Sequence, residues 1–295
     1  MFTSTAAIVV DAPAKINLTL DVLGRRDDGY HTLCSVMQTL DLHDTLTLDS
    51  TNDDEITFTC DVPALQGDDN LVVRAAHLLR AHVGGTAGVR LGLCKRIPAE
   101  AGLGGGSSDT AAALRGLDRL WGLRLPTAEL RDLGARLGSD VPFFFHAPTA
   151  LVTGRGDVVE TLSPAPPAHV VLYKPLVGVA TGRVFAGFPA PRYTDDGATR
   201  RLQEALRAGL PPSRWPLSNG LQQTVAELYP EVAARLDALR VAGAPRPMMT
   251  GSGSTVYAIF DDAPAARAVY ERLLGKGQGQ GQEHEAILTR FALPA

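Results

Sequence analysis

Pro98-Ala99-Glu100-Ala101-Gly102-Leu103-Gly104-Gly105-Gly106-Ser107-Ser108-Asp109 joins an apolar run to an alanine-rich segment, and it contains four glycines and two adjacent serines. Glycines let backbone N–H groups approach an anion closely because no Cβ obstructs them. A helix beginning at Asp109 would direct its positive N-terminal end toward the same place. The segment therefore predicts a site that binds phosphate.

The spacing of these glycines excludes two common nucleotide motifs. A Walker loop requires a lysine directly after its last glycine, and none follows here. In the dinucleotide pattern Gly-x-Gly-x-x-Gly, the last glycine would fall on Ser107 or Asp109. A flexible turn is the alternative, since glycine and serine clusters are often loops. The ordered flanks and the serines at a helix start favour the phosphate site.

The composition indicates a soluble globular protein of one large or two ordinary domains, with 295 residues, 45% hydrophobic and 20% charged. A net charge of −4 provides no basic surface for nucleic acid or an anionic membrane. Cys34, Cys60 and Cys94 are far apart and odd in number, which is typical of reduced thiols in the cytoplasm. No apolar run reaches membrane-spanning length, the N-terminus lacks a signal-peptide pattern, and metal-ligand spacing is absent.

Hydrophobic periodicity predicts a mixed succession of strands and helices. Strands are expected over residues 6–11, 15–22, 45–48, 55–60, 89–97, 169–174 and 255–260. Helices are expected from Asn70 to Gly84, from Asp109 to Trp121, from a Thr127 cap to Gly138, around 181–188, and over 222–239. The proline-rich run 163–167 predicts a linker between two domains, 1–162 and 163–295. Residues 192–213 read as a variable surface region and 275–282 as a low-complexity loop.

Lys15 and Asn17 are two residues apart on a predicted strand, so they project from the same face. An ammonium and an amide side by side suit a site that holds a phosphoryl oxygen and a hydroxyl. The alternative is a lysine that protects an edge strand from aggregation.

Three further segments combine a turn or helix end with polar groups. Tyr30 and His31 follow an Asp-Gly turn signal, and together they could stack on and hydrogen-bond a nucleobase, although a structural histidine is the alternative. Asp140 lies between a helix end and an apolar run, so it needs a cation such as Lys15, or hydrogen bonds; a helix cap is the alternative. Residues 249–255 form a second loop of glycines and hydroxyls, either a hairpin or a lining of the phosphate site.

Residues 13–18, 28–31 and 102–109 read Pro-Ala-Lys-Ile-Asn-Leu, Asp-Gly-Tyr-His and Gly-Leu-Gly-Gly-Gly-Ser-Ser-Asp. In this order they resemble the GHMP small-molecule kinases, which include galactokinase, homoserine kinase and mevalonate kinase, and the resemblance covers nearly the whole chain. The triple glycine and the Tyr-His pair resemble the branch whose acceptor is 4-diphosphocytidyl-2-C-methyl-D-erythritol. The resemblance implies ATP-dependent phosphorylation of its 2-hydroxyl, in the non-mevalonate route to isopentenyl diphosphate. Alternatives are a homoserine or mevalonate type of kinase, or a nucleotide-binding protein without catalysis.

The resemblance also implies a two-domain α+β fold, with a ribosomal protein S5 domain 2-like N-terminal domain and a ferredoxin-like C-terminal domain. It assigns catalysis to Lys15 and Asp140. ATP contacts fall on Pro98–Ser108 and Asn70, with Lys95 or Arg96 nearby. Substrate contacts fall on Asn17, Tyr30, His31, Thr181 and Phe185.

Two departures from the family pattern concern acids and the metal. Asn219-Gly220-Leu221-Gln222 stands where the family often has Asn-Asp and a further acid. Mg²⁺ is expected as a cofactor, but the serine that holds it in some relatives aligns near Gly105 or Gly106, so no metal ligand is assigned. The expected partner is a small molecule with a cytidine diphosphate group, bound by a monomer or weak homodimer.

Overall fold

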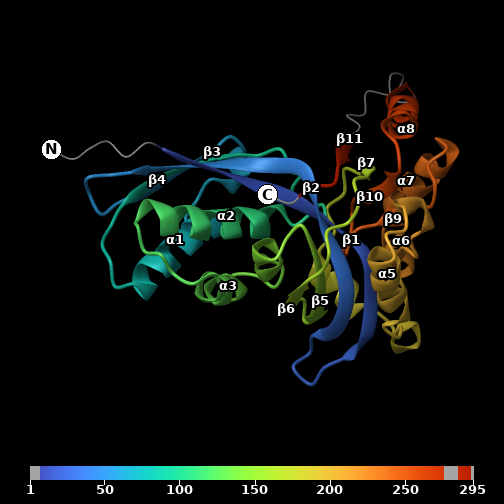
Figure 1. The fold of residues 1–295 in the computed structure, drawn as a ribbon, viewed down its shortest axis with the longest axis horizontal. Helices are drawn as coiled ribbons and strands as arrows, with labels where there is room; N and C mark the ends of the chain where they lie inside the picture. Colours follow the sequence, from blue (N-terminus) through green and yellow to red (C-terminus); the bar gives the residue numbers. More distant parts are fainter. Residues whose placement is uncertain (1–6, 276–284, 294–295) are drawn as a thin grey trace. The chain divides into compact units, whose positions relative to one another are not determined.

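The computed structural model describes residues 7–275 and 285–293. The chain packs into two compact units (Figure 1). Of the described residues, unit 1 comprises 7–14, 42–98 and 104–145, and unit 2 comprises 15–41, 99–103, 146–275 and 285–293. The long strands β1 (Ile8–Arg25) and β2 (His31–Ser50) run through both units. The domain boundary expected after residue 162 stays a prediction.

Unit 1 is a sheet covered on one face by helices (Figure 1). Strand β3 (Ile56–Cys60) runs parallel to β4 (Val89–Cys94), which pairs antiparallel with residues 45–50 of β2. The helical elements are α1 (Leu71–His82), α2 (Gly105–Leu120), α3 (Thr127–Ala135), η1 (Pro63–Leu65) and η2 (Val141–Phe145). Alternate residues of β4 are buried against α1 and α2, which places one apolar core between sheet and helices.

Unit 2 contains two sets of strands. The first has the order β6-β5-β2-β1-β8, with β5 (Thr149–Gly154), β6 (Val158–Thr161) and β8 (Ser218–Asn219). The second is an antiparallel sheet in the order β11-β7-β10-β9, formed by β11 (Glu285–Arg290), β7 (His169–Lys174), β10 (Val256–Phe260) and β9 (Met248–Met249).

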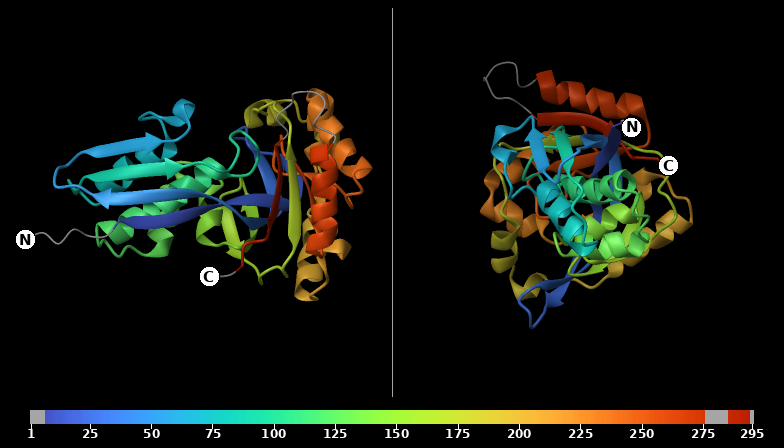
Figure 2. Two further views of the ribbon diagram at one scale, coloured as in Figure 1. Left: turned by 90° about the horizontal axis from the view of Figure 1, so that it is seen from above. Right: turned by 90° about the vertical axis from the view of Figure 1, so that its left-hand side faces the viewer.

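Helices α7 (Pro230–Val241) and α8 (Ala263–Gly275) pack on the second sheet, and α8 runs beside β11 (Figure 2). The remaining helices of unit 2 are α4 (Thr181–Ala186), α5 (Gly197–Arg207), α6 (Gln222–Leu228), η3 (Ala190–Arg192) and η4 (Pro212–Arg214). Among the described residues, no helix is both long enough and apolar enough to cross a membrane.

The structure corrects several predicted boundaries. Helix α2 begins at Gly105 rather than Asp109, because Gly104 adopts φ 72° and serves as its N-cap. The helix expected over 222–239 is broken, since Pro230 has no N–H and starts α7 after α6 has ended. Pro126, not Thr127, is the N-cap of α3.

Other corrections concern strands. The two strands expected over 6–11 and 15–22 form the single strand β1, and the strand from Val89 ends at Cys94 rather than Ile97. Helix α5 lies in the region read as variable surface, and β5, β6, α8 and β11 were not predicted. No helix or strand lies within 162–168, which includes the run 163–167 where a linker was expected. Most of the low-complexity segment 275–282 lies outside the described residues.

Candidate active site

The glycine segment forms the start of α2 in unit 1. Gly105, Gly106 and Ser107 precede the first intrahelical hydrogen bond, which Ser108 N donates to Gly104 O at 2.9 Å. The N–H groups of such a first turn lack helical acceptors and attract anions. A Cβ on Gly105 would lie 3.2 Å from Ile97 Cγ2, so a side chain there would crowd this turn. The local geometry suits phosphate, and the role of Gly104–Ser108 stays a prediction.

The preceding residues, Ala99–Leu103, belong to unit 2 and contact the second glycine loop, Met249–Ser254. Ala101 O accepts a hydrogen bond from Thr255 N at 3.2 Å, and Gly102 has φ 74°. A Cβ on Gly102 would lie 2.7 Å from the carbonyl oxygens of Thr250 and Gly253. The second glycine loop joins β9 to β10 as a hairpin and packs against Ala101 and Gly102, and its place in the lining of a phosphate site stays a prediction.

Lys15 lies on β1 and is almost fully buried, with 3% exposure. Its Nζ donates a hydrogen bond to Asn17 Oδ1 at 2.8 Å, which confirms that the two side chains share a face. Because an edge-protecting lysine would be exposed, burial rules out that alternative. Asn17 Nδ2 in turn donates to Ser35 Oγ at 2.8 Å, so a chain of hydrogen bonds holds the amide in place.

Two polar groups from outside β1 complete the surroundings of Asn17. Thr250 Oγ1 accepts a hydrogen bond from Asn17 N at 3.1 Å. The hydroxyl of Tyr257 donates to Asn17 O at 2.8 Å, and complete burial raises the pKa of Tyr257. Asn219 Nδ2 donates to the carbonyl oxygens of Met249 and Gly251, which anchors the second glycine loop beside this strand. The sequence analysis had not singled out Tyr257 or this role of Asn219.

Asp140 lies between α3 and η2 and is half-buried. It belongs to unit 1, whereas Lys15 belongs to unit 2. The pairing of Lys15 with Asp140, and the catalytic role of each, stay predictions.

Three of the predicted substrate residues, Tyr30, His31 and Phe185, are aromatic and belong to unit 2. His31 is buried, and its ring centroid lies 5.1 Å from that of Phe185 in a tilted arrangement. Burial and the charge of Arg25 lower the pKa of His31, which favours the neutral ring. Tyr30 is 54% exposed, and Arg155 Cζ lies 5.0 Å from its ring centroid. Arg155 therefore supports one face of an otherwise exposed tyrosine, a contact that the sequence did not reveal.

Thr181, the remaining predicted substrate residue, begins α4 and is exposed. Its Oγ1 lies 2.7 Å from Ser252 Oγ of the second glycine loop. The structure thus brings Thr181 to the loop that also contacts Asn17. Thr181 is exposed and Ser252 is half-buried, and the substrate contact of Thr181 stays a prediction.

Asn70 uses its side chain locally. Its Oδ1 accepts a hydrogen bond from Val72 N at 2.9 Å, and its Nδ2 donates to Leu65 O at 2.9 Å. The predicted start of α1 is therefore confirmed, with Asn70 as N-cap. Its contact with a nucleotide stays a prediction.

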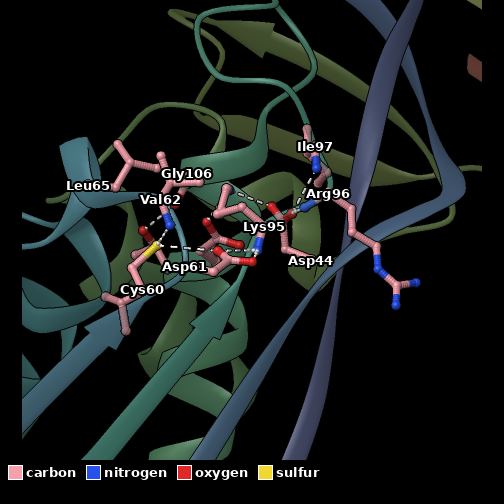
Figure 3. Close-up of polar contacts among 12 residues, drawn as sticks. Asp44, Cys60, Asp61, Val62, Leu65, Lys95, Arg96, Ile97 and Gly106 are labelled. Atoms are coloured by element: carbon pink, nitrogen blue, oxygen red, sulfur yellow. Dashed lines mark hydrogen bonds and ion pairs between the residues drawn. The ribbon is translucent and has the colours of Figure 1, made fainter. Parts of the chain in front are cut away.

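Lys95 forms two buried ion pairs that the sequence analysis missed (Figure 3). Its Nζ lies 2.5 Å from Asp44 Oδ2 and 2.7 Å from Asp109 Oδ2. Asp44 takes a place in the alternating series Leu42, Asp44, Leu46 and Leu48, and an acid on this apolar face is the signal that could have revealed it. Among the described residues, no group of three or more His, Cys, Asp or Glu side chains is arranged to hold a metal ion.

Comparisons with known proteins identify the family. The model for the GHMP kinases N-terminal domain matches residues 70–147, and the model for the GHMP kinases C-terminal domain matches residues 197–278. The chain belongs to the GHMP kinase family. GHMP kinases use ATP as phosphate donor, so the expected ATP-dependent kinase and its α+β fold are confirmed.

Relatives within the GHMP kinases share most of the length of this chain. A protein of Bacillus pumilus named 4-diphosphocytidyl-2-C-methyl-D-erythritol kinase is 40% identical, covering 91% of this chain and 93% of its own. A protein of Pelotomaculum thermopropionicum with the same name is 44% identical, covering 88% and 92%. A crystal structure of 4-(cytidine 5'-diphospho)-2C-methyl-D-erythritol kinase matches with a TM-score of 0.83 and 33% identity, covering 97% of this chain and 100% of its own.

Proposed function

We propose that this chain transfers the γ-phosphoryl group of ATP to the 2-hydroxyl of 4-diphosphocytidyl-2-C-methyl-D-erythritol, giving the 2-phosphate and ADP. The observation that carries this proposal is the identity of 40% over nine-tenths of the chain with a kinase named for that substrate. The reaction would belong to the non-mevalonate route to isopentenyl diphosphate. The neutral, buried His31 beside Phe185 supports an acceptor with a planar base.

Phosphoryl transfer needs mainly positioning and neutralisation of charge from the protein. The N–H groups at the start of α2 would bind the ATP phosphates. Asp140 would accept the proton of the attacking hydroxyl as general base. Lys15, held at Asn17, would stabilise the negative charge on the oxygens of the transferring group.

We expect Mg²⁺ as the cofactor that accompanies the nucleotide. Phosphate oxygens are ligands that Mg²⁺ prefers, and those of the nucleotide would hold it. When bound, it would supply neutralisation of charge on the β- and γ-phosphates. No protein ligand is assigned to it.

The cytidine group of the acceptor would lie between aromatic side chains. Tyr30, supported from one side by Arg155, offers an exposed ring for stacking, and Phe185 offers a second. A neutral His31 has one donor and one acceptor nitrogen, so it can form hydrogen bonds that distinguish cytosine from uracil. Asn17 and Thr181 would contact the rest of the acceptor.

We further propose that the enzyme acts in the cytoplasm as a monomer or weak homodimer. The free thiols of Cys34, Cys60 and Cys94 support a reducing compartment. Size-exclusion chromatography with light scattering tests the oligomeric state.

The experiment that tests the acceptor uses purified protein, Mg-ATP and a panel of alcohols. The panel contains the cytidine diphosphate-linked methylerythritol, its uridine analogue, free methylerythritol, homoserine and mevalonate. We expect ADP release with the cytidine compound at a kcat/KM far above that of the others. Phosphorylation of homoserine or mevalonate in preference to the cytidine compound would contradict the proposal.

A further inference from the structure

The segment between β4 and the glycine run, Lys95–Ile97, is held by carboxylates. The pairing of β2 with β4 ends at Thr45 and Cys94. Beyond that point, the N–H of Lys95 donates to Asp61 Oδ1 at 3.0 Å. The N–H groups of Arg96 and Ile97 then donate to Asp44 Oδ1 at 2.5 and 2.8 Å (Figure 3). The carboxylates of Asp61 and Asp44 thus take the place of a neighbouring strand as hydrogen-bond acceptors for three successive backbone N–H groups.

Asp44 also reaches helix α2 through Lys95. Its second oxygen, Oδ2, accepts from Lys95 Nζ, and the same ammonium donates to Asp109 Oδ2 in the second turn of α2. The side chains of Asp44, Lys95 and Asp109 are 0%, 7% and 4% exposed. We call these three residues the acid–lysine clamp. It joins the segment that enters the glycine run to the helix that leaves it.

The ammonium of the clamp lies directly beside the first helical glycine. A Cβ on Gly105 would be 3.3 Å from Lys95 Nζ. Because two carboxylates already take up this ammonium, Lys95 is a cross-link within the protein rather than a cation directed at a ligand. The anion site at Gly105–Ser107 then depends on backbone N–H groups, whose positions the clamp fixes.

The balance of charge inside the clamp is unusual for a purely structural contact. Two carboxylates share one ammonium, and Asp109 Oδ1 and Ser108 Oγ are buried without a hydrogen-bond partner among the described residues. Burial raises the pKa of Asp109 to about 7. Buried ion pairs are often no more stabilising than well-packed apolar side chains of similar volume. A role in positioning explains better why charged groups occupy this place.

We propose that Asp44 is a positioning residue for ATP: through Lys95 and Asp109 it holds the first turn of α2 in the geometry that binds the nucleotide phosphates. This inference rests on the proposed use of the glycine run as the ATP phosphate site. It extends that proposal to Asp44 and Lys95, which lie outside the stretch Pro98–Ser108 assigned to ATP, and to Asp109, which directly follows that stretch. Asp44 itself is not expected to touch the nucleotide.

The variant Asp44→Asn separates positioning from packing. It preserves the shape, and its amide oxygen can still accept from Arg96 and Ile97, but its NH₂ group cannot accept from Lys95. We expect KM and Kd for ATP to rise about 10- to 100-fold, the loss that corresponds to weakened charge-assisted hydrogen bonds to phosphate. The turnover number at saturating ATP and the KM for the acceptor should change by less than about twofold. Asp49→Asn, on the same strand, is the matched control and should resemble the parent.

A triple variant, Asp44→Asn with Lys95→Met and Asp109→Asn, distinguishes positioning from stability and also serves if the single variant folds poorly. Removing all three charged groups should return the melting temperature toward that of the parent, because no buried charge is left without its partner. ATP affinity should stay weak, since the cross-link is still missing. The proposal is overturned if ATP affinity recovers together with stability, or if Asp44→Asn binds ATP like the parent. Calorimetry with ATP alone measures this, so an incorrect acceptor would not affect the result.

Discussion

Lys15 Nζ lies 2.8 Å from Asn17 Oδ1, across one intervening residue of β1. Both side chains are buried, and Asn17 is further held by Ser35 and Thr250. The ammonium therefore has a fixed position before any ligand binds. Such pre-organisation is what stabilisation of a developing charge requires, because no reorganisation is needed during the reaction.

Replacing the proposed base tests the catalytic assignment. Asp140→Asn keeps the shape of the side chain but cannot accept the proton of the attacking hydroxyl. We expect kcat to fall by about 10²- to 10⁴-fold, as for other lost acid–base groups, while calorimetric ATP affinity stays near that of the parent. Asp132→Asn, at an exposed position of α3, is the control. Near-normal turnover of Asp140→Asn would mean that this aspartate has a structural role.

The glycine run can be tested by adding a side chain at its first helical position. In Gly105→Val, a Cβ would lie 3.2 Å from Ile97 Cγ2 and 3.3 Å from Lys95 Nζ, and its methyl groups would obstruct the approach of phosphate. Gly104→Val should act similarly, because φ is 72° there. We expect KM for ATP to rise far more than KM for the acceptor. For comparison, Gly24→Ala has nothing within 4 Å of the new Cβ. Equal damage to both substrates with a large loss of thermal stability would point to a purely structural turn.

The aromatic residues near His31 test whether the acceptor is recognised through its base. A stacked base contributes about 1–3 kcal/mol in single-strand binding proteins, so Tyr30→Ala or Phe185→Ala should weaken acceptor binding roughly 5- to 150-fold. ATP affinity should be nearly unchanged. His31→Ala should reduce the preference for cytidine over uridine. If all three variants bind cytidine diphosphate like the parent in calorimetry, recognition does not involve the base.

The protonation of His31 should make binding of the base depend on pH. Burial lowers the pKa of His31 from its ordinary value of 6.5, so the His31 ring of the folded protein is neutral above pH 6.5. The contribution of the neutral His31 ring to binding of the base is therefore present above pH 6.5. This contribution is lost as the pH falls through the lowered pKa of His31. Affinity for cytidine, which has no phosphate to titrate, should decrease over this range in calorimetry. The pH dependence should be absent in His31→Asn, and an unchanged profile in that variant would assign the titration to another group.

Local sequence patterns were sufficient for several elements. The strand His169–Lys174 follows from a short, continuous run of β-branched and aromatic apolar residues. The Asn70 cap of α1 follows from a side chain that satisfies a free N–H. The common face of Lys15 and Asn17 follows from the two-residue period of a strand. The order of motifs along the chain was enough to indicate the GHMP kinase family.

Contacts between distant residues required the tertiary structure. Asp44 and Lys95 are 51 positions apart, and no periodicity links them, yet the pairing of β2 with β4 brings them together. The packing of Gly102 against the carbonyls of Thr250 and Gly253 is likewise invisible in the sequence. Local propensity depends on residues within about one turn of a helix or on the adjacent residues of a strand. It therefore identifies the helices and strands and the faces that they present. Which buried charges meet depends on strand register and helix packing, which arise only when the whole core forms.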